Sequence, residues 1–307
     1  MISTENKKST LRTARAQAVL KGTPQLMEVL QSRKGPKGDA LEVARTAGIL
    51  GGKKTWEWIP FCHPIAIEQI AIQYEFQNDS VTVISEVRSV GKTGVEMEAL
   101  VAAQIAATTL FDMLKLIDSS MTIEGVKVLE KSGGKTTFRE KIPENFKAAV
   151  IVTSDGTFSG KRKDRSGILI KNFLDELGIP VKEYLILPDD KVKIQSALRT
   201  LFEKEYNLVL TTGGTGLSPR DVTVEATKEV IDREVPGIVE VARHFGQQRT
   251  PYAMLSRGIA GLKGKMLIVN LPGSSKGALE SLHAIFPAVL HSYPMMEGGG
   301  HEEGGKK

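Results

Sequence analysis

The chain has 307 residues, with 41 lysines and arginines against 36 aspartates and glutamates, so its net charge at neutral pH is +5. Hydrophobic residues make up 41% and charged residues 25%, which excludes a wholly disordered chain, and the length predicts two domains. The single cysteine, Cys62, excludes a disulfide framework and a cysteine-rich zinc site and fits a reducing compartment.

The start of the chain and its apolar stretches predict a cytoplasmic protein. Residues 1–15 are polar and lack the apolar segment of a signal peptide. The longest apolar stretch, 99–111, is interrupted by polar side chains and is shorter than a bilayer-spanning helix. Basic residues are spread over both halves, with one small cluster at 161–165. We therefore expect neither a membrane nor a nucleic acid as a partner.

The first half predicts an α+β domain over residues 1–138. A helix is expected over 39–50, which opens with an aspartate and a glutamate at capping-box spacing. Alternating apolar residues at 70–76 and 80–87 flank a Gln-Asn-Asp turn and predict an antiparallel hairpin. A long, nearly apolar segment over 95–117 predicts a buried helix.

The second half, 147–291, follows a charged linker with a proline at 139–146. Strands are expected over 148–153, 181–187, 207–211 and 266–270, and helices over 166–177, 192–203, 222–231, 235–245 and 276–290. This alternation, with nearly continuous apolar strands, predicts a three-layer α/β domain with a mostly parallel sheet. The last segment, 292–307, is rich in glycine and charge, and we expect a disordered tail.

Titratable residues cluster at several points of the first half. Asp112 and Lys115 share one face of the long predicted helix, either as an ordinary helix salt bridge or as a paired acid and base at the mouth of a pocket. Glu98 lies on the same stripe of that helix. Lys37 lies in a turn before a helix start, where anions are favoured. His63 has no further histidine or cysteine at metal-ligand spacing, so we expect no zinc.

Taken in order, these motifs resemble the cyclic pyranopterin monophosphate synthases of the MoaC family. The resemblance is carried by Lys37-Gly38-Asp39, Phe61-Cys62-His63-Pro64, the segment 91–100, Asp112-Met113 and Glu130-Lys131-Ser132-Gly133-Gly134-Lys135. It implies a ferredoxin-like fold assembled as a hexamer with active sites at subunit contacts. It also implies conversion of 3′,8-cyclo-7,8-dihydroguanosine triphosphate into cyclic pyranopterin monophosphate with loss of pyrophosphate, without a cofactor.

The resemblance also implies roles for individual residues. The catalytic residues it implies are Asp112, Lys115 and Lys37, and the chemistry of His63 makes it a further candidate acid or base. The substrate-binding residues it implies are Phe61, Cys62, His63, Met97 and Glu98, and the cations that suit the triphosphate are Arg12, Lys131 and Lys135 together with Lys37. These residue types suit the reaction, because a triphosphate needs cations and rebuilding a purine ring needs proton transfers.

Three loops in the second half each follow a predicted strand: 153–156, 213–221 and 271–277. Ligands of parallel sheets bind beyond the carboxyl ends of the strands, and glycines allow backbone amides to approach an anion. The 213–221 loop has neither the lysine of a Walker loop nor the spacing of a dinucleotide fingerprint. Any one loop is compatible with a plain turn, but together they predict a small-molecule site.

These loops resemble the MogA/MoaB group of molybdopterin-binding proteins. The resemblance implies a molybdopterin adenylyltransferase, commonly a trimer, that joins AMP from Mg-ATP to the terminal phosphate of molybdopterin. The binding residues it implies are Asp155, Asp189, Gly213, Gly214, Thr215, Gly216, Ser218, Asp221, Pro272, Gly273 and Ser274. Of these, Asp189 and Asp221 are the expected Mg²⁺ ligands, since carboxylates near a triphosphate suit that ion.

The sequence therefore predicts a bifunctional enzyme of molybdenum cofactor biosynthesis with small-molecule substrates. An alternative makes the second half a non-catalytic pterin-binding or assembly module, and a further one makes both glycine-rich regions structural turns only. Threefold symmetry in both families predicts a homo-oligomer, either a trimer or a hexamer.

Overall fold

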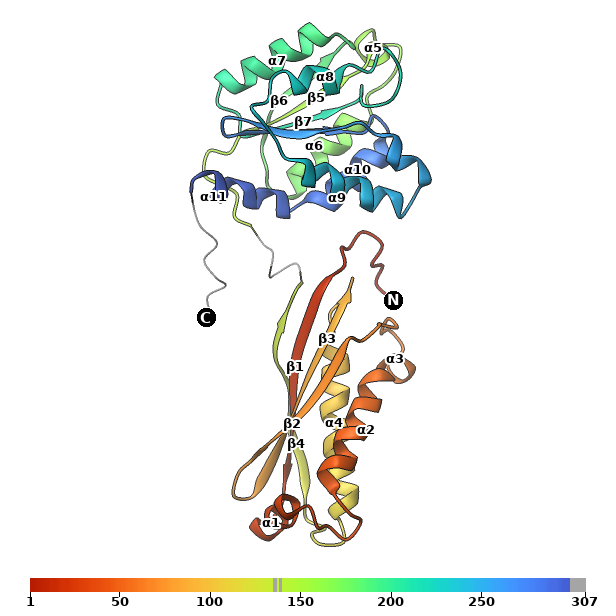
Figure 1. The fold of residues 1–307 in the computed structure, drawn as a ribbon, viewed down its shortest axis with the longest axis vertical. Helices are drawn as coiled ribbons and strands as arrows, with labels where there is room; N and C mark the ends of the chain where they lie inside the picture. The colour runs from red at the N-terminus through yellow and green to blue at the C-terminus, as the bar shows by residue number, and fades with distance from the viewer. Residues whose placement is uncertain (135–136, 138–139, 299–307) are drawn as a thin grey trace. The chain divides into compact units, whose positions relative to one another are not determined.

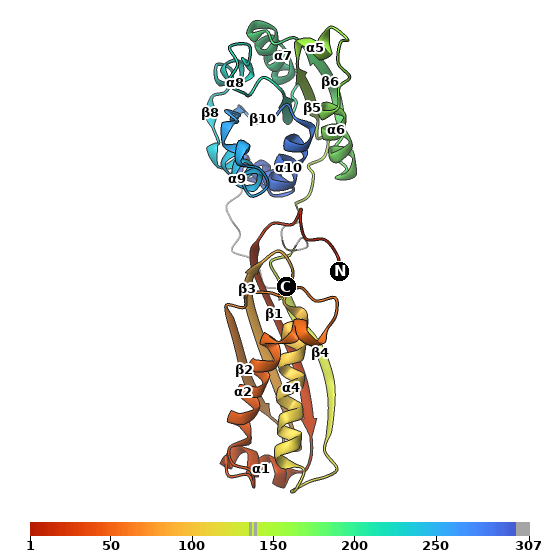
Figure 2. The same ribbon diagram turned by 90° about the vertical axis from the view of Figure 1, so that its right-hand side faces the viewer.

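The computed structural model describes residues 1–134, 137 and 140–298. The chain divides into two compact units, Met1–Phe138 (unit 1) and Arg139–Lys307 (unit 2), drawn in two views in Figures 1 and 2. Each unit is described by itself. Lys135, predicted to bind substrate, and 299–307 of the predicted tail lie outside the described residues.

Unit 1 is an α+β unit with one antiparallel sheet. Its elements are β1 (Thr10–Lys21), α1 (Pro24–Ser32), α2 (Ala40–Lys53), α3 (Thr55–Trp58), β2 (Gln69–Phe76), β3 (Ser80–Gly91), α4 (Glu96–Leu114) and β4 (Thr122–Ser132). The strands lie in the order β2-β3-β1-β4, and each neighbouring pair is antiparallel. The hairpin expected at 70–87 is β2 and β3, whereas α1, β1 and β4 were not predicted.

Helices α2 and α4 cover one face of this sheet (Figures 1 and 2). Alternate residues of β1 point toward the helices, and Ala14, Ala16 and Ala18 are fully buried there. Small side chains also line α4, including the fully buried Ala102 and Ala106. Because alanines let backbones approach closely, α4 lies tightly against both the sheet and α2.

Helix α4 (Glu96–Leu114) confirms the buried helix predicted over 95–117 and contains the whole apolar stretch 99–111. By length and composition alone its 19 residues could cross a membrane. Its apolar character has another explanation, because much of its surface is buried against the sheet and α2. It is the core helix of unit 1.

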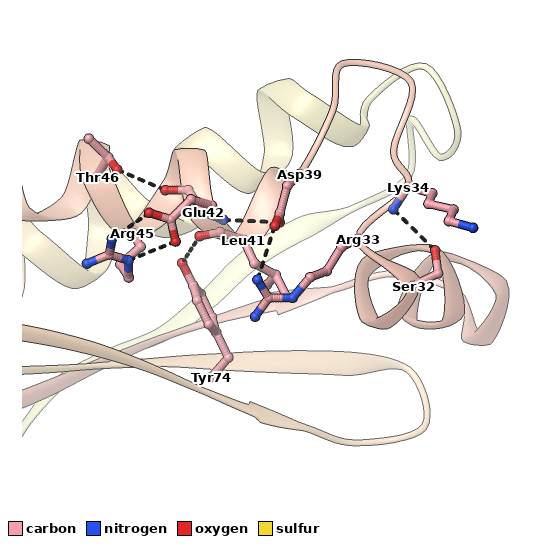
Figure 3. Close-up of polar contacts among 9 residues, drawn as sticks. All are labelled: Ser32, Arg33, Lys34, Asp39, Leu41, Glu42, Arg45, Thr46 and Tyr74. Atoms are coloured by element: carbon pink, nitrogen blue, oxygen red, sulfur yellow. Dashed lines mark hydrogen bonds and ion pairs between the residues drawn. The ribbon is translucent and has the colours of Figure 1, made fainter.

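The start of α2 is fixed by a polar network, shown in Figure 3. Asp39 is the N-cap, and its carboxylate accepts a hydrogen bond from the backbone N–H of Glu42 at 3.2 Å. The same carboxylate pairs with Arg33 at 3.1 Å. The hydroxyl of Tyr74 on β2 donates to the Leu41 carbonyl at 2.8 Å. These contacts fix the turn before α2, and Lys37 is part of that turn.

Unit 2 is an α/β unit with a six-stranded sheet. Its main elements are β5 (Ala148–Thr153), α5 (Asp155–Phe158), α6 (Ser166–Glu176), β6 (Val181–Leu187), α7 (Lys191–Glu203), β7 (Leu208–Thr212), α8 (Thr223–Lys228), β8 (Arg233–Glu234), α9 (Pro236–Gln247), η1 (Pro251–Leu255), β9 (Ala260–Lys263), β10 (Met266–Leu271), α10 (Ser275–Ile285), η2 (Ala288–His291) and α11 (Ser292–Met296). The strand order is β6-β5-β7-β10-β9-β8. Strands β6, β5, β7 and β10 are parallel to one another, and β9 pairs antiparallel with both β10 and β8, so β9 alone of the six is reversed. This confirms the mostly parallel sheet.

Helices cover both faces of this sheet, giving three layers (Figure 1). One core joins the sheet to α7 and α8, through residues such as Leu198 and Ala226. The other core joins it to α6, α9 and α10, through residues such as Leu174 and Leu282. Strands β5, β7 and β10 are buried along their whole length, which is why they have continuous apolar sequences.

Two predicted boundaries of unit 2 are wrong. The expected tail from 292 begins with helix α11, where Tyr293 is buried and donates to the Asn207 carbonyl at 3.0 Å. The expected linker ends in a buried core residue, Phe146, whose ring meets the Tyr293 ring edge-on at 4.9 Å. Both segments contribute aromatic side chains to the core despite their polar neighbours.

Candidate functional sites

A carboxylate held by two lysines marks the C-terminal end of α4. Asp112 accepts hydrogen bonds from Lys37 at 2.9 Å and from Lys115 at 2.8 Å, one on each carboxylate oxygen. The Lys37 ammonium also donates to the Asp112 carbonyl at 2.9 Å. Hydrogen bonds from Lys115 and Lys37 lower the pKa of Asp112 to about 2, so this carboxylate is ionised at neutral pH.

A cavity of about 1040 Å³ lies at the other end of α4. The predicted residues that line it are Phe61, Cys62, His63, Met97, Glu98 and Lys131. The first three come from the segment between α3 and β2, Met97 and Glu98 from the first turn of α4, and Lys131 from the end of β4. Met1 and Ile2 from the start of the chain also line it. The cavity is large enough for a nucleotide-sized ligand.

The most buried charge-bearing residue in this cavity is Glu98, which is 3% exposed. Burial raises the pKa of Glu98 to about 6; its own backbone N–H opposes this shift and the charge of Glu96 adds to it. Burial, followed by the charge of Glu98, also raises the pKa of the Cys62 thiol. A carboxyl that titrates near neutral pH can both release and accept a proton.

An ion pair in the same cavity includes a residue that the sequence reasoning missed. Glu96 accepts a hydrogen bond from Lys131 at 3.0 Å. Burial raises the pKa of Glu96, but Lys131, the Glu96 backbone N–H and Arg12 together hold it below its usual value. Its position in the first turn of a helix, where acidic residues are favoured, could have drawn attention to it. Arg12 itself donates to the Gly91 carbonyl at 3.2 Å.

The predicted site of unit 1 is thus divided between the two ends of α4. Glu98 and Asp112 are 14 positions apart, which corresponds to about 21 Å along a helix that rises 1.5 Å per residue. They share a stripe of the helix, as predicted, but they cannot contact one substrate group together. The expectation that Asp112 and Lys115 lie at the mouth of the pocket is therefore wrong within one chain, where they form a helix ion pair.

In unit 2, two predicted carboxylates meet at the carboxyl ends of β5 and β6. The Asp155 backbone N–H donates to the Asp189 carboxylate at 3.1 Å, and the Asp189 N–H donates to the Asp155 carboxylate at 3.1 Å. Burial raises the pKa of Asp189; Asp155 and Asp221 then add negative charge nearby, opposed by a backbone hydrogen bond from Asp155 and by Arg220. This concentration of negative charge would favour a cation.

The glycine loop after β7 lies directly against the first and third loops. Gly213 has φ +101°, and a Cβ there would lie 2.1 Å from the Thr153 carbonyl oxygen. A Cβ on Gly273 would lie 3.2 Å from the Gly213 Cα, and the Thr212 hydroxyl donates to the Pro272 carbonyl at 2.8 Å. The structure therefore brings the three predicted loops together at one edge of the sheet.

The second part of this loop forms a closed turn. The Ser218 N–H donates to the Asp221 carboxylate at 2.8 Å, and the Asp221 N–H donates back to the Ser218 carbonyl at 2.9 Å. The side chain of Arg257, which no motif indicated, donates to the carbonyls of Gly216 and Asp221. Because Arg257 lies about 40 residues after the loop, no local motif in the sequence links it to the loop.

A small cavity of about 170 Å³ borders the third loop. Pro272 and Ser274 line it, together with Asn270, Arg243 and Glu280. Asn270 is 3% exposed, and its amide donates to two buried threonine hydroxyls at 2.9 Å each. Its location just before the Leu-Pro-Gly-Ser turn is the signal that could have identified it.

Across residues 1–134, 137 and 140–298, no group of three or more His, Cys, Asp or Glu side chains could hold a metal ion. Burial raises the pKa of Asp189 most, and the two expected Mg²⁺ ligands, Asp189 and Asp221, lie close enough for the charge of Asp221 to raise it further.

The comparisons with known proteins agree in both halves. The MoaC family model matches residues 1–134, and a model described as "Probable molybdopterin binding domain" matches residues 149–291. A molybdenum cofactor biosynthesis bifunctional protein of Chlorobaculum tepidum is 35% identical over 301 residues, covering 98% of this chain and 96% of the relative. The chain belongs to this family of bifunctional molybdenum cofactor biosynthesis proteins.

Further relatives extend this picture of the family. A bifunctional protein of Synechococcus elongatus is 36% identical over 314 residues, covering 98% of each chain. A cyclic pyranopterin monophosphate synthase of Aquifex aeolicus is 36% identical over 195 residues, covering 62% of this chain and 73% of the relative. The solved MoaB structure of Thermus thermophilus is 45% identical, covers 50% of this chain and 97% of that one, and has a TM-score of 0.48. Family membership confirms both predicted resemblances and a role in molybdenum cofactor biosynthesis.

Proposed function

We propose that unit 1 converts 3′,8-cyclo-7,8-dihydroguanosine triphosphate into cyclic pyranopterin monophosphate and pyrophosphate. The observation that carries this proposal is the nucleotide-sized cavity in which a buried carboxyl, Glu98, faces the same space as Lys131 and His63. The match to the MoaC family model over residues 1–134 supports it. The strand order β2-β3-β1-β4, with helical crossovers before β2 and before β4, supports a ferredoxin-like fold for this unit.

The residues at both ends of α4 suit the steps of this reaction. Lys131 and Lys37 supply cations for the triphosphate, and Arg12 lies near Glu96 beside the cavity. Glu98, with its pKa near neutral, is the group best suited to exchange protons with the purine ring as it opens. Asp112 stays ionised and anchors the ammonium groups of Lys37 and Lys115, which can take part in proton transfer.

We infer that the complete site forms between two copies of the chain. The Asp112 cluster of one copy would meet the Glu98 cavity of another, because about 21 Å of helix separates them within one copy. This arrangement requires a homo-oligomer. It also means that a substitution at one end of α4 in one copy leaves intact the site to which that copy contributes only its other end.

Mixing two inactive variants tests this arrangement. At a substrate concentration well below the wild-type KM, full-length Asp112→Asn and Lys131→Ala proteins should each lose most product formation, and unfolding and refolding them together should restore about a quarter of wild-type activity. In a random mixture, half of the contacts between copies join opposite variants. If each contact forms two sites, one of the two is intact in these mixed contacts, which gives a quarter of all sites. Recovery indistinguishable from that of the separate variants would refute the shared site while leaving the proposed reaction testable on the wild type.

We propose that unit 2 transfers AMP from Mg-ATP to the terminal phosphate of molybdopterin. A phosphate oxygen of molybdopterin would attack the α-phosphorus of ATP, and the bond from that phosphorus to the β-phosphate oxygen would break, releasing pyrophosphate. The meeting of three strand-end loops supports this proposal. The glycine loop lies at the same sheet edge as Asp155 and Asp189, so its backbone amides would bind phosphates beside carboxylates that would bind their Mg²⁺.

An assay of the full chain with molybdopterin and Mg-ATP tests this second activity. Adenylyl-molybdopterin should accumulate together with an equal amount of pyrophosphate, and Asp221→Asn should abolish both. Tight binding of molybdopterin without either product would make unit 2 a pterin-binding module instead.

A further inference from the structure

The side chain that organises the glycine loop of unit 2 comes from a distant segment. Arg257 lies between η1 and β9, about 40 residues after the loop. Its Nε donates to the Gly216 carbonyl at 2.6 Å and its Nη2 to the Asp221 carbonyl at 2.8 Å. The two ends of the segment 216–221 are therefore tied to a single guanidinium group.

The remaining contacts of Arg257 anchor this arrangement. Its Nη1 pairs with the carboxylate of Glu225 in the first turn of α8. Its backbone N–H donates to the Thr215 carbonyl at 2.9 Å. The hydrogen bond from Arg257 is the main cause of the lowered pKa of Glu225, so this carboxylate remains charged and keeps the guanidinium in place.

Arg257 thus holds a turn that is also closed by its own hydrogen bonds. Within 216–221, the Ser218 N–H and the Asp221 carboxylate hydrogen-bond to each other, and the Asp221 N–H returns to the Ser218 carbonyl. Leu217, at the tip of the turn, is 67% exposed, so no core packing holds that tip in place. Polar contacts from outside must supply the order that a binding loop needs.

We propose that Arg257 is a positioning residue: it holds the loop 216–221 so that Asp221 is oriented for adenylyl transfer without itself touching the substrate. This inference rests on the proposed function of unit 2. Only arginine suits the role, because its planar group presents donors in three fixed directions, whereas a lysine ammonium cannot reach two carbonyls and a carboxylate in that geometry.

Arg257→Lys and Arg257→Ala in the full chain test the proposal, with Arg233→Lys on the exposed edge strand β8 as the matched control. We expect kcat for adenylyl transfer to fall about tenfold in Arg257→Lys and about hundredfold in Arg257→Ala, with the KM for ATP changed less than about threefold. Hydrogen exchange of the Ser218 and Asp221 amides should accelerate at least about tenfold, because their protecting turn opens. Arg233→Lys should match the wild type in both measurements.

The two measurements separate the possible failures. Faster exchange with unchanged kcat would overturn the proposal, as would a lower kcat with unchanged exchange, since Arg257 would then act directly on the substrate. A wild-type chain that makes no adenylyl-molybdopterin would refute the proposed function. Amide exchange alone would then decide whether Arg257 holds the loop, with unchanged exchange overturning that role.

Discussion

Replacing Gly213 by alanine should damage unit 2 through one specific close approach. Its φ of +101° costs an L-residue roughly 1–2 kcal/mol. The added methyl would lie 2.1 Å from the Thr153 carbonyl oxygen, far inside an ordinary contact, and this oxygen belongs to the end of a buried strand. Forcing such an overlap costs roughly 1–3 kcal/mol more. We therefore expect Gly213→Ala to lower the free energy of unfolding of unit 2 by about 2–5 kcal/mol.

Gly160→Ala is the matched control, because Gly160 also has positive φ (+74°) but no heavy atom within 4 Å of its added Cβ. It should show only the backbone cost of roughly 1–2 kcal/mol. The units can be followed separately in the full chain, since both tryptophans, Trp56 and Trp58, lie in unit 1. The urea unfolding transition followed by tryptophan fluorescence should therefore be the same in both variants as in the wild type.

Hydrogen exchange over β5 and β7 at increasing urea then measures the stability of unit 2. If Gly213→Ala and Gly160→Ala lower the free energy of unfolding of unit 2 equally, the close approach between the first and second loops is refuted. An altered tryptophan transition would show that the substitution acts beyond unit 2.

Two further predictions concern the cavity of unit 1. Because burial raises the pKa of Glu98 to about 6, the folded state is penalised progressively as pH rises from about 4.5 to 6, and not below that window. Glu98→Gln should therefore raise the free energy of unfolding of unit 1 by about 2 kcal/mol at pH 7 and leave it unchanged at pH 4. Urea unfolding followed by tryptophan fluorescence measures this, and equal effects at both pH values would contradict the prediction. Lys131→Met should raise the KM for the triphosphate substrate at least about tenfold, since a phosphate-binding cation is lost, whereas Lys127→Met on the same strand should not; a matching KM in the two variants would remove Lys131 from the site.

Much of the fold could be predicted from the sequence where one signal dominated. The buried parallel strands of unit 2 are continuous apolar runs, and β5 and β6 begin and end at the predicted residues, 148–153 and 181–187. The edge strand β4 escaped prediction because its residues are mostly exposed and it has no apolar alternation. The short strand β8 has only two residues and no pattern to detect. Tertiary pairing, not local propensity, makes these segments strands.

Motifs in the sequence named the candidate site residues, but they did not reveal how those residues are arranged in space. Cys62, His63 and Glu98 do line one cavity, as their motifs indicated. The helical period places Asp112 on the same stripe of α4 as Glu98. The length of the helix, however, puts Asp112 at the end of α4 opposite to the cavity. Arg257 gave no signal at all, because two of its partners are backbone carbonyls, which have no residue identity, and the third, the Glu225 carboxylate, lies 32 positions away in the sequence.

Product analysis of the full chain tests most directly the claim that one polypeptide carries two enzymes. The purified protein would receive 3′,8-cyclo-7,8-dihydroguanosine triphosphate in one reaction and molybdopterin with Mg-ATP in another, with products identified by mass spectrometry. We predict cyclic pyranopterin monophosphate in the first and adenylyl-molybdopterin in the second, with Asp112→Asn abolishing only the first and Asp221→Asn only the second. Absence of either product from the wild type, or loss of both in one variant, would contradict the account.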